Sequence, residues 1–214
     1  MPRRTPWIIL LCKFSDDPGT ATLRSIADYA AFFGGDDPES IPSYWRDMSY
    51  GELDLVTGTE VSPWLQLSQK RSDHVGLSTR KNLFEWAKAA GRNVGIDFDR
   101  FFGAVAFFAV PTDLFGTSSD PHVVCDILSS PAQIQQEYGH AYGQMKHSSA
   151  VLNPVAYENP FCIMSSLRFG ADMEVFRGVD PTFASKWGPS GPGLCSAFVL
   201  EFGWLPQPRS VSVL

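Results

Sequence analysis

A short segment in the second half of the chain combines residue types that can bind a metal ion and move a proton. Gln136 and His140 are four residues apart, and Glu137 directly follows the first of them. On a helix, side chains four apart lie on one face, one turn above the other. Two such groups can share one metal ion, and the neighbouring carboxylate can reach a water molecule bound to that ion. The pattern therefore predicts a metal-dependent hydrolytic site.

The flanking residues predict the helix that would present these side chains. Ser130 can cap the helix start, Pro131 suits the first helical position, and Gln133 can complete a capping box. Gly143 supplies a left-handed stop, so the helix should cover about residues 131–142. The chain then turns, which allows a further ligand to approach the same ion.

His147 follows this turn and is the expected third ligand. Together with a water molecule it would complete a tetrahedral site with the open position that catalysis needs. Lys146 is a poor ligand because it is charged at neutral pH and lacks a lone pair. Gln136 offers an amide oxygen, whereas zinc and copper favour nitrogen, so we expect a lower metal affinity or a shifted metal preference.

The segment QEYGHAYGQMKHS, from Gln136 to Ser148, is similar to the extended zinc-binding motif of metzincin-like peptidases. It most resembles the gametolysin-type and immune-inhibitor-A-like families, and gametolysin-type enzymes often have glutamine at the first position. The segment NPFCIMS, from Asn159 to Ser165, resembles the Met-turn of these families. In the usual motif the third ligand falls at the position of Lys146, so His147 implies a loop that is one residue longer.

The resemblance implies a zincin-like α/β (α+β) fold with a mixed twisted sheet, an active-site helix and a smaller irregular C-terminal lobe after Gly143. It implies a single catalytic domain over residues 1–214, with an N-terminal lobe at about 1–143 and a C-terminal lobe at about 144–214. Residues 44–55 and 202–206 also resemble parts of such domains.

The implied activity is that of a metal-dependent endopeptidase acting on a protein or peptide substrate. Zinc, or copper because of Gln136, would acidify a bound water and polarise the scissile carbonyl, with Glu137 as general base. Met164 would form the apolar floor beneath the site, and Tyr157 can reach a developing oxyanion. The alternative is an inactive pseudopeptidase that serves as a protein-binding module, which Gln136 and the offset of His147 favour.

Apolar patterns upstream of the motif predict the scaffold. Continuous or short apolar runs predict strands at residues 6–14, 53–56, 64–67 and 104–110. Helical spacing with caps predicts helices at residues 21–33, 41–49 and 79–90, the last one ending at Gly91. This order of strands and helices predicts a mixed sheet backed by helices.

Charge and hydropathy narrow the classes of partner. The 214 residues carry a formal net charge of -6, and no cluster of Lys and Arg marks a nucleic-acid footprint. No apolar run approaches the ~18 residues of a membrane span. The run at residues 7–12 is shorter than a signal-peptide core and no small-residue cleavage site follows it. We expect a monomer without nucleic-acid or membrane partners, cytoplasmic as written, or secreted by family resemblance if a leader was removed.

The remaining groups with metal or redox chemistry leave alternatives open. Four widely spaced cysteines form no CxxC pair, which argues against a structural zinc: Cys12, Cys125, Cys162 and Cys195. Cys125 and Cys162 flank the two site segments and are either disulfide-bonded or buried thiols. Asp97 and Asp99 can hold a structural calcium or simply shape a turn, and His122 should lie in the loop before the helix.

Overall fold

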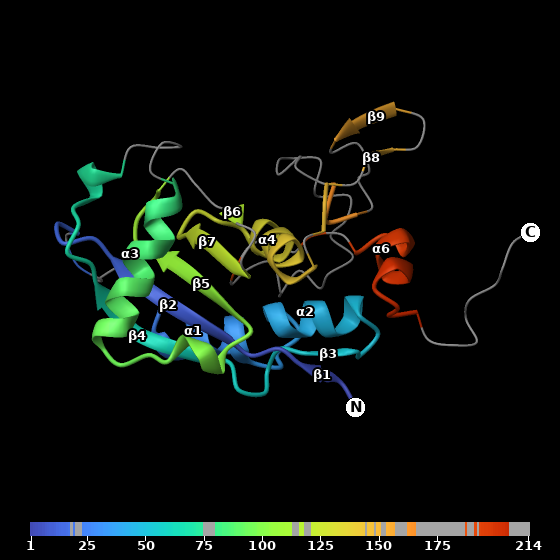
Figure 1. The fold of residues 1–214 in the computed structure, drawn as a ribbon, viewed down its shortest axis with the longest axis horizontal. Helices are drawn as coiled ribbons and strands as arrows, with labels where there is room; N and C mark the ends of the chain where they lie inside the picture. Colours follow the sequence, from blue (N-terminus) through green and yellow to red (C-terminus); the bar gives the residue numbers. More distant parts are fainter. Residues whose placement is uncertain are drawn as a thin grey trace, which may run out of the picture.

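A five-stranded sheet with helices on both faces forms the body of the protein (Figure 1). The computed structural model describes residues 1–17, 19, 23–74, 80–112, 116–117, 121–143, 145–147, 149–150, 153–156, 162–165, 187, 191 and 193–205. Within these residues, no helix is long and apolar enough to cross a bilayer.

The sheet is mixed, as the sequence predicts. Its strand order is β4-β2-β5-β7-β6, in which the first four strands are parallel and β6 pairs antiparallel with β7 at the edge. The strands are β2 (Trp7–Lys13), β4 (Glu60–Gln66), β5 (Gly103–Phe108), β6 (Gly116–Thr117) and β7 (His122–Asp126). Two small pairs lie outside this sheet: β1 (Arg3–Arg4) with β3 (Leu53–Asp54), and β8 (Ser149–Ala150) with β9 (Asn153–Ala156).

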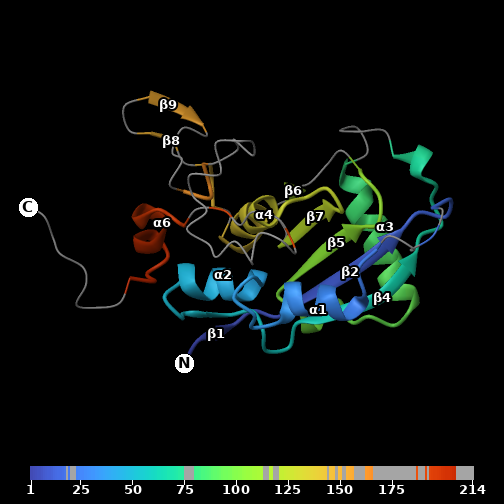
Figure 2. The same cartoon turned by 180° about the vertical axis from the view of Figure 1, so that it is seen from behind.

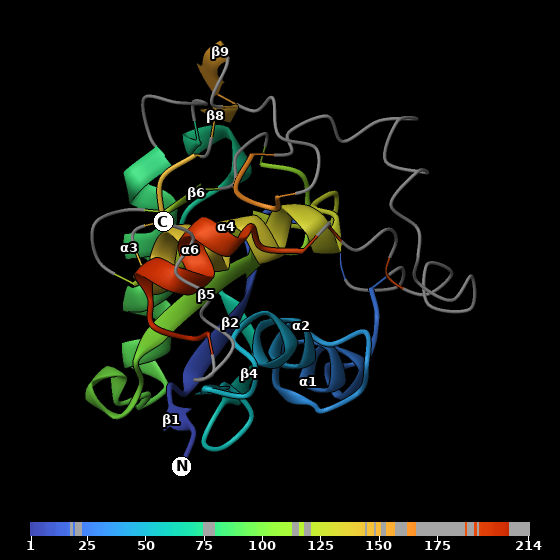
Figure 3. The same cartoon turned by 90° about the vertical axis from the view of Figure 1, so that its right-hand side faces the viewer.

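The helices divide between the two faces of the sheet. Figure 3 shows α3 on one side of the strands and both α1 and α2 on the other. Figure 2 shows α1 in front of the strands, with α2 next to it. The helices are α1 (Ile26–Gly34), α2 (Ile41–Met48), α3 (Arg80–Asn93), α4 (Pro131–Gly143) and α6 (Ser196–Glu201), with short 3-10 helices at η1 (Arg71–Asp73) and η3 (Phe98–Arg100).

The continuous apolar run of β2 reflects burial on both faces. Trp7, Ile9 and Leu11 pack into the core shared with α1, α2 and α4. Ile8 and Leu10 pack into the second core, against α3. Successive side chains of a strand point to opposite faces, so a central parallel strand covered on both sides needs apolar residues throughout.

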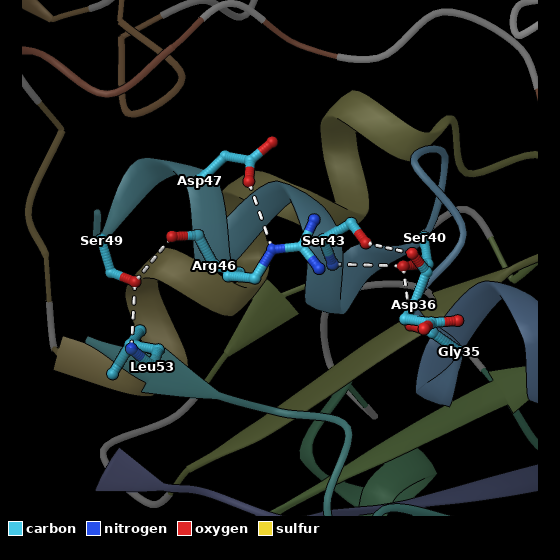
Figure 4. Close-up of polar contacts among 8 residues, drawn as sticks. All are labelled: Gly35, Asp36, Ser40, Ser43, Arg46, Asp47, Ser49 and Leu53. Carbon is cyan, nitrogen blue, oxygen red and sulfur yellow. Dashed lines mark hydrogen bonds and ion pairs between the residues drawn. The ribbon is translucent and has the colours of Figure 1, made fainter. Parts of the chain in front are cut away.

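Helix α2 is fixed at both ends by serine side chains (Figure 4). Ser40 Oγ accepts the Ser43 N–H at 3.1 Å and donates to the Gly35 carbonyl at 2.8 Å. At the other end, Ser49 Oγ donates to the Arg46 carbonyl and accepts the Leu53 N–H, both at 3.1 Å. These bonds tie α2 to the end of α1 and to β3, and α2 in turn supports α4.

Two helix boundaries differ from the sequence predictions by more than one residue. The first helix begins at Ile26 because Ser25 forms a capping box with Asp28, while residues 20–22 lie outside the described part. Helix α3 continues through Gly91 to Asn93. A Cβ at Gly91 would lie 3.0 Å from Phe98 Cζ, so this glycine allows close packing inside the helix.

Strand β7 was not predicted, and His122 was expected in a loop. His122 instead begins β7 and pairs with Ala104 of β5. Its ring stacks on Phe84 of α3, with ring centroids 4.0 Å apart. His122 therefore lies on the face of the sheet opposite α4.

Candidate metal centre

Helix α4 begins where the sequence predicts and is held there by its capping box. The Ser130 N–H donates to Gln133 Oε1 at 2.8 Å, and the Gln133 N–H donates to Ser130 Oγ at 3.3 Å. Upstream, buried Asp126 at the end of β7 accepts the Leu128 N–H at 2.8 Å. The turn between β7 and α4 is thereby fixed, and α4 packs against β7 and α2.

The middle of α4 approaches two other elements closely at Gly139. A Cβ at this position would lie 2.5 Å from Met164 Sδ and 3.2 Å from Trp45 Cη2 of α2. Met164 is fully buried. Its thioether thus lies against the residue before His140.

His140 and His147 are brought together with their Nε2 atoms 3.0 Å apart. The two ring planes are inclined at 77° and their centroids are 4.6 Å apart. His140 Nδ1 contacts the Met145 carbonyl oxygen. A carbonyl can only accept, so Nδ1 carries the proton and the lone pair of neutral His140 is on Nε2, facing His147.

The loop after α4 explains why His147, and not Lys146, reaches His140. The Met145 N–H donates to the Gly139 carbonyl at 3.4 Å, and the Met145 side chain is buried. Both backbone groups of Met145 therefore bind α4, and two residues later His147 returns to the helix. Lys146, between them, is exposed, and so is His147.

Gly143 ends α4, but it does so without the left-handed conformation that we expected. The backbone φ angle of Gly143 is not positive. A Cβ on Gly143 would lie 2.5 Å from Phe202 Cζ. The glycine is therefore needed for the close approach of the residue that follows α6, and the turn toward His147 depends on Met145.

Gln136 and Glu137 are both buried on α4, with exposed fractions of 1% and 7%. Gln136 lies one turn before His140, about 40° around the helix axis. Its Nε2 is buried and has no hydrogen-bond partner among the described residues. The two amide positions exchange by a half-turn of the side chain, so either atom can occupy this place. Burial, and then the negative charges of Asp126 and Glu137, raise the pKa of the Cys125 thiol. Glu137 is therefore near Cys125 of β7.

Comparison with known proteins adds no family assignment. No protein-family model matches the chain, and no curated protein matches its sequence. The assignment of function therefore depends on the residues of α4 and the loop that follows it.

The remaining predictions concern residues outside α4 and the loop that follows it. Tyr157 lies outside the described residues. Asp97 accepts the Asp99 N–H at 3.1 Å as the N-cap of η3, which is the turn that the sequence offered as the alternative to calcium. Cys125 and Cys162 are both buried free thiols, which is the second of the two alternatives that the sequence left open. Cys162 Sγ instead accepts the Cys195 N–H at 3.4 Å.

A separate cavity of about 330 Å³ lies at the start of α4. Pro131 and Ile134 line it together with aromatic side chains of α1 and β5. At 100° per residue, these two positions lie on roughly the opposite side of α4 from Gln136 and His140. The histidine pair is therefore not part of this cavity.

Metal binding should depend on pH in a way set by the two histidines. Burial lowers the pKa of His140, and burial followed by the charge of His140 lowers the pKa of His147. Both rings therefore stay neutral, the form that binds metals, down to a pH below the ordinary histidine value of about 6.5. Zinc affinity measured by calorimetry should be nearly constant from pH 8 to 6.5 and should fall at lower pH, where protons compete. An affinity already falling between pH 8 and 7 would contradict this.

The same pKa shifts should affect stability of the metal-free protein. Between the lowered folded pKa values and 6.5, the unfolded chain binds protons that the folded chain does not. The contribution of both histidines to stability is therefore greatest above pH 6.5 and declines as the pH falls below it.

Proposed function

We propose that the protein is a zincin-like metal-dependent endopeptidase whose metal is held by Gln136, His140 and His147. The observation that carries the proposal is the convergence of the two histidine Nε2 atoms at 3.0 Å. In a tetrahedral zinc site with ligands at about 2.0–2.1 Å, neighbouring nitrogens are about 3.3 Å apart. The pair is thus within a few tenths of an ångström of the spacing that zinc requires.

The surroundings of the pair support metal binding. The Met145 carbonyl holds His140 Nδ1–H, which is the outer-shell contact that orients metal-bound histidines. Gln136, with its orphaned amide, lies on the same face of α4 as His140. Its oxygen would supply the third protein ligand and leave one position open. Two nitrogens and one oxygen suit zinc, and copper is the second candidate.

Glu137 would act as general base in this site. It is buried on α4 directly after Gln136, and in the proposed site it would take a proton from the attacking water and return it to the leaving amine. A bound ion would supply the polarisation of the scissile carbonyl. Burial of Glu137 limits solvent access and so strengthens its interaction with the reacting groups.

The scaffold is compatible with this proposal. A mixed sheet flanked by helices leads directly from β7 into α4, so a rigid element presents the ligands. We propose a single catalytic domain with its smaller lobe after Gly143, acting as a monomer on protein or peptide substrates.

One observation favours the alternative of a pseudopeptidase that serves as a binding module. In the described part of the chain, no group of three or more His, Cys, Asp or Glu side chains is placed to hold a metal. Among the described residues the proposed third ligand is Gln136, whose neutral oxygen is the weakest donor of the set.

Metal loading of the full chain tests the proposal. The protein is purified without added metal, incubated with zinc and dialysed to remove unbound zinc. It should then retain about one zinc ion per chain, as measured by elemental mass spectrometry. Gln136→His should bind zinc roughly tenfold more tightly in a chelator competition, because imidazole replaces the amide. Ser68→His, which adds an exposed histidine after β4 at the far edge of the sheet, is the matched control and should leave the affinity unchanged.

Two outcomes would contradict the ligand set. If Gln136→His binds zinc as weakly as the parent protein, Gln136 is not a ligand. If neither protein retains zinc or copper, the binding-module alternative stands and the peptidase proposal fails.

A further inference from the structure

The segment around residues 191–195 connects three parts of the fold. The Gly191 N–H donates to Gln135 Oε1 of α4 at 2.9 Å. The Leu194 N–H donates to Met48 Sδ of α2 at 3.1 Å. The Ile163 N–H donates to the Gly193 carbonyl at 2.8 Å, which joins the segment to the turn that carries Met164. One backbone bond to the turn, together with bonds to one side chain of α4 and one of α2, therefore holds these residues beside the turn.

Cys162 and Cys195 are neighbours within this arrangement. The Cys195 N–H donates to Cys162 Sγ, with nitrogen and sulfur 3.4 Å apart. Standard bond lengths and angles then place the two Cα atoms within about 7 Å of each other. Disulfide-bonded cysteines have Cα atoms about 4.4–6.8 Å apart. Rotation of the two side chains, with little movement of the backbone, can therefore join the two sulfurs.

We propose that Cys162 and Cys195 are a site of oxidative modification at which a disulfide forms, linking the turn under α4 to the start of α6. Cys195 is the N-cap residue of α6, and Cys162 begins the turn that places Met164 against Gly139. The bond would fix the position of this turn relative to α6 covalently. It depends on neither the identity nor the presence of a metal.

Cys195 and Cys162 differ in solvent exposure, and this difference determines which thiol reacts first. Cys195 is partly exposed, whereas Cys162 is fully buried. The Cys195 thiolate attacks a small disulfide such as glutathione disulfide, forms a mixed disulfide and releases one thiolate. Cys162 then loses its proton and attacks Cys195 Sγ, so that the protein disulfide forms and a second small thiol leaves. Two protein thiols are oxidised and one small disulfide is reduced to two thiols.

The other two cysteines should remain thiols under the same conditions. Cys12 and Cys125 are fully buried in the strands of the sheet. Burial raises the pKa of both thiols, which leaves little of the reactive thiolate. They therefore serve as internal references in the same molecule.

Peptide mapping of the full chain tests this proposal without any substitution. The folded protein is incubated with excess glutathione disulfide, the remaining thiols are alkylated after denaturation, and the digest is analysed by mass spectrometry without reduction. We expect a cross-linked peptide that contains Cys162 and Cys195, and alkylated peptides for Cys12 and Cys125. The thermal midpoint should rise by about 5 °C or more relative to the reduced protein, because the link closes a long loop in the unfolded chain.

Two variants then show which cysteines cause the rise of the thermal midpoint on oxidation. Cys195→Ser should lose the shift between reduced and oxidised samples, whereas Cys12→Ala should retain it, each compared with its own reduced form. Alkylation of both Cys162 and Cys195 after oxidation would overturn the proposal, as would stable glutathione adducts or a cross-link to Cys125. Retention of zinc by the same samples tests the metal site separately, so the two proposals can fail independently.

Discussion

Glu137→Gln should reduce peptide-bond cleavage by about a thousandfold while leaving metal content unchanged. Positioned general bases contribute about 10²–10⁴-fold, and glutamine preserves the shape of the side chain but cannot accept the proton. Glu137 is not among the proposed ligands, so zinc should still bind. The measurement is the rate of casein cleavage by the zinc-loaded wild type and variant, together with metal content per chain.

The matched control for this experiment is Glu201→Gln. Glu201 is an exposed glutamate at the end of α6, so its replacement removes the same charge from the surface of the protein. It should leave the rate within about twofold, as surface substitutions usually do. Equal rates for Glu137→Gln and wild type would exclude Glu137 as the base, and equal losses in both variants would indicate a non-specific charge effect.

His147→Ala should weaken zinc binding by more than about a hundredfold, whereas Lys146→Ala should leave it nearly unchanged. Loss of an outer-shell contact alone costs 10–100-fold in metal affinity, so loss of a ligand should cost more. The two residues are adjacent, but only His147 returns to His140. Competition with a chromogenic chelator measures both affinities, and unfolding curves of the metal-free variants show whether each still folds.

The reverse result would be decisive against the proposed centre. If Lys146→Ala weakens zinc binding and His147→Ala does not, the loop takes the register of the usual motif and the His140–His147 contact has another role. If both variants retain full affinity, the ion is held by a different set of residues.

The start of α4 could be predicted from sequence because its signals are local. Ser130 and Gln133 satisfy each other across three residues, and this bond forms as the pattern indicates. The mixed sheet was likewise predictable from the apolar runs of β2 and β5. The zincin-like assignment of this sheet stays a prediction.

Features that depend on distant contacts could not be read from the sequence. Strand β7 is short, begins with histidine and ends with aspartate, and its five residues become a strand by pairing with β5. Gly91 and Gly143 resemble helix stops, yet a Cβ on either would meet the rings of Phe98 and Phe202. The sequence does not show whether a glycine is needed for a left-handed backbone conformation or because a neighbouring side chain leaves no room for a Cβ atom.

Whether Lys146 or His147 returns to His140 also depends on contacts that the sequence does not indicate. It depends on how far the loop after α4 travels before it returns, and that length is set by the two backbone bonds of Met145. Backbone groups are present at every residue, so no sequence signal marks this position. The residue type of Met145 indicates only that its side chain is buried.

The parallel pairing of β2 has a consequence for synthesis of the protein on the ribosome. Ile8 pairs with Glu60 of β4, and Trp7 pairs with Gly103 of β5. At about 5–20 residues per second, several seconds or more separate the emergence of β2 from that of its second partner. During that interval the six apolar residues from Trp7 to Cys12 have only one neighbouring strand or none. The nascent chain therefore exposes this apolar segment until β5 has been synthesised, and during that time the segment is prone to aggregation.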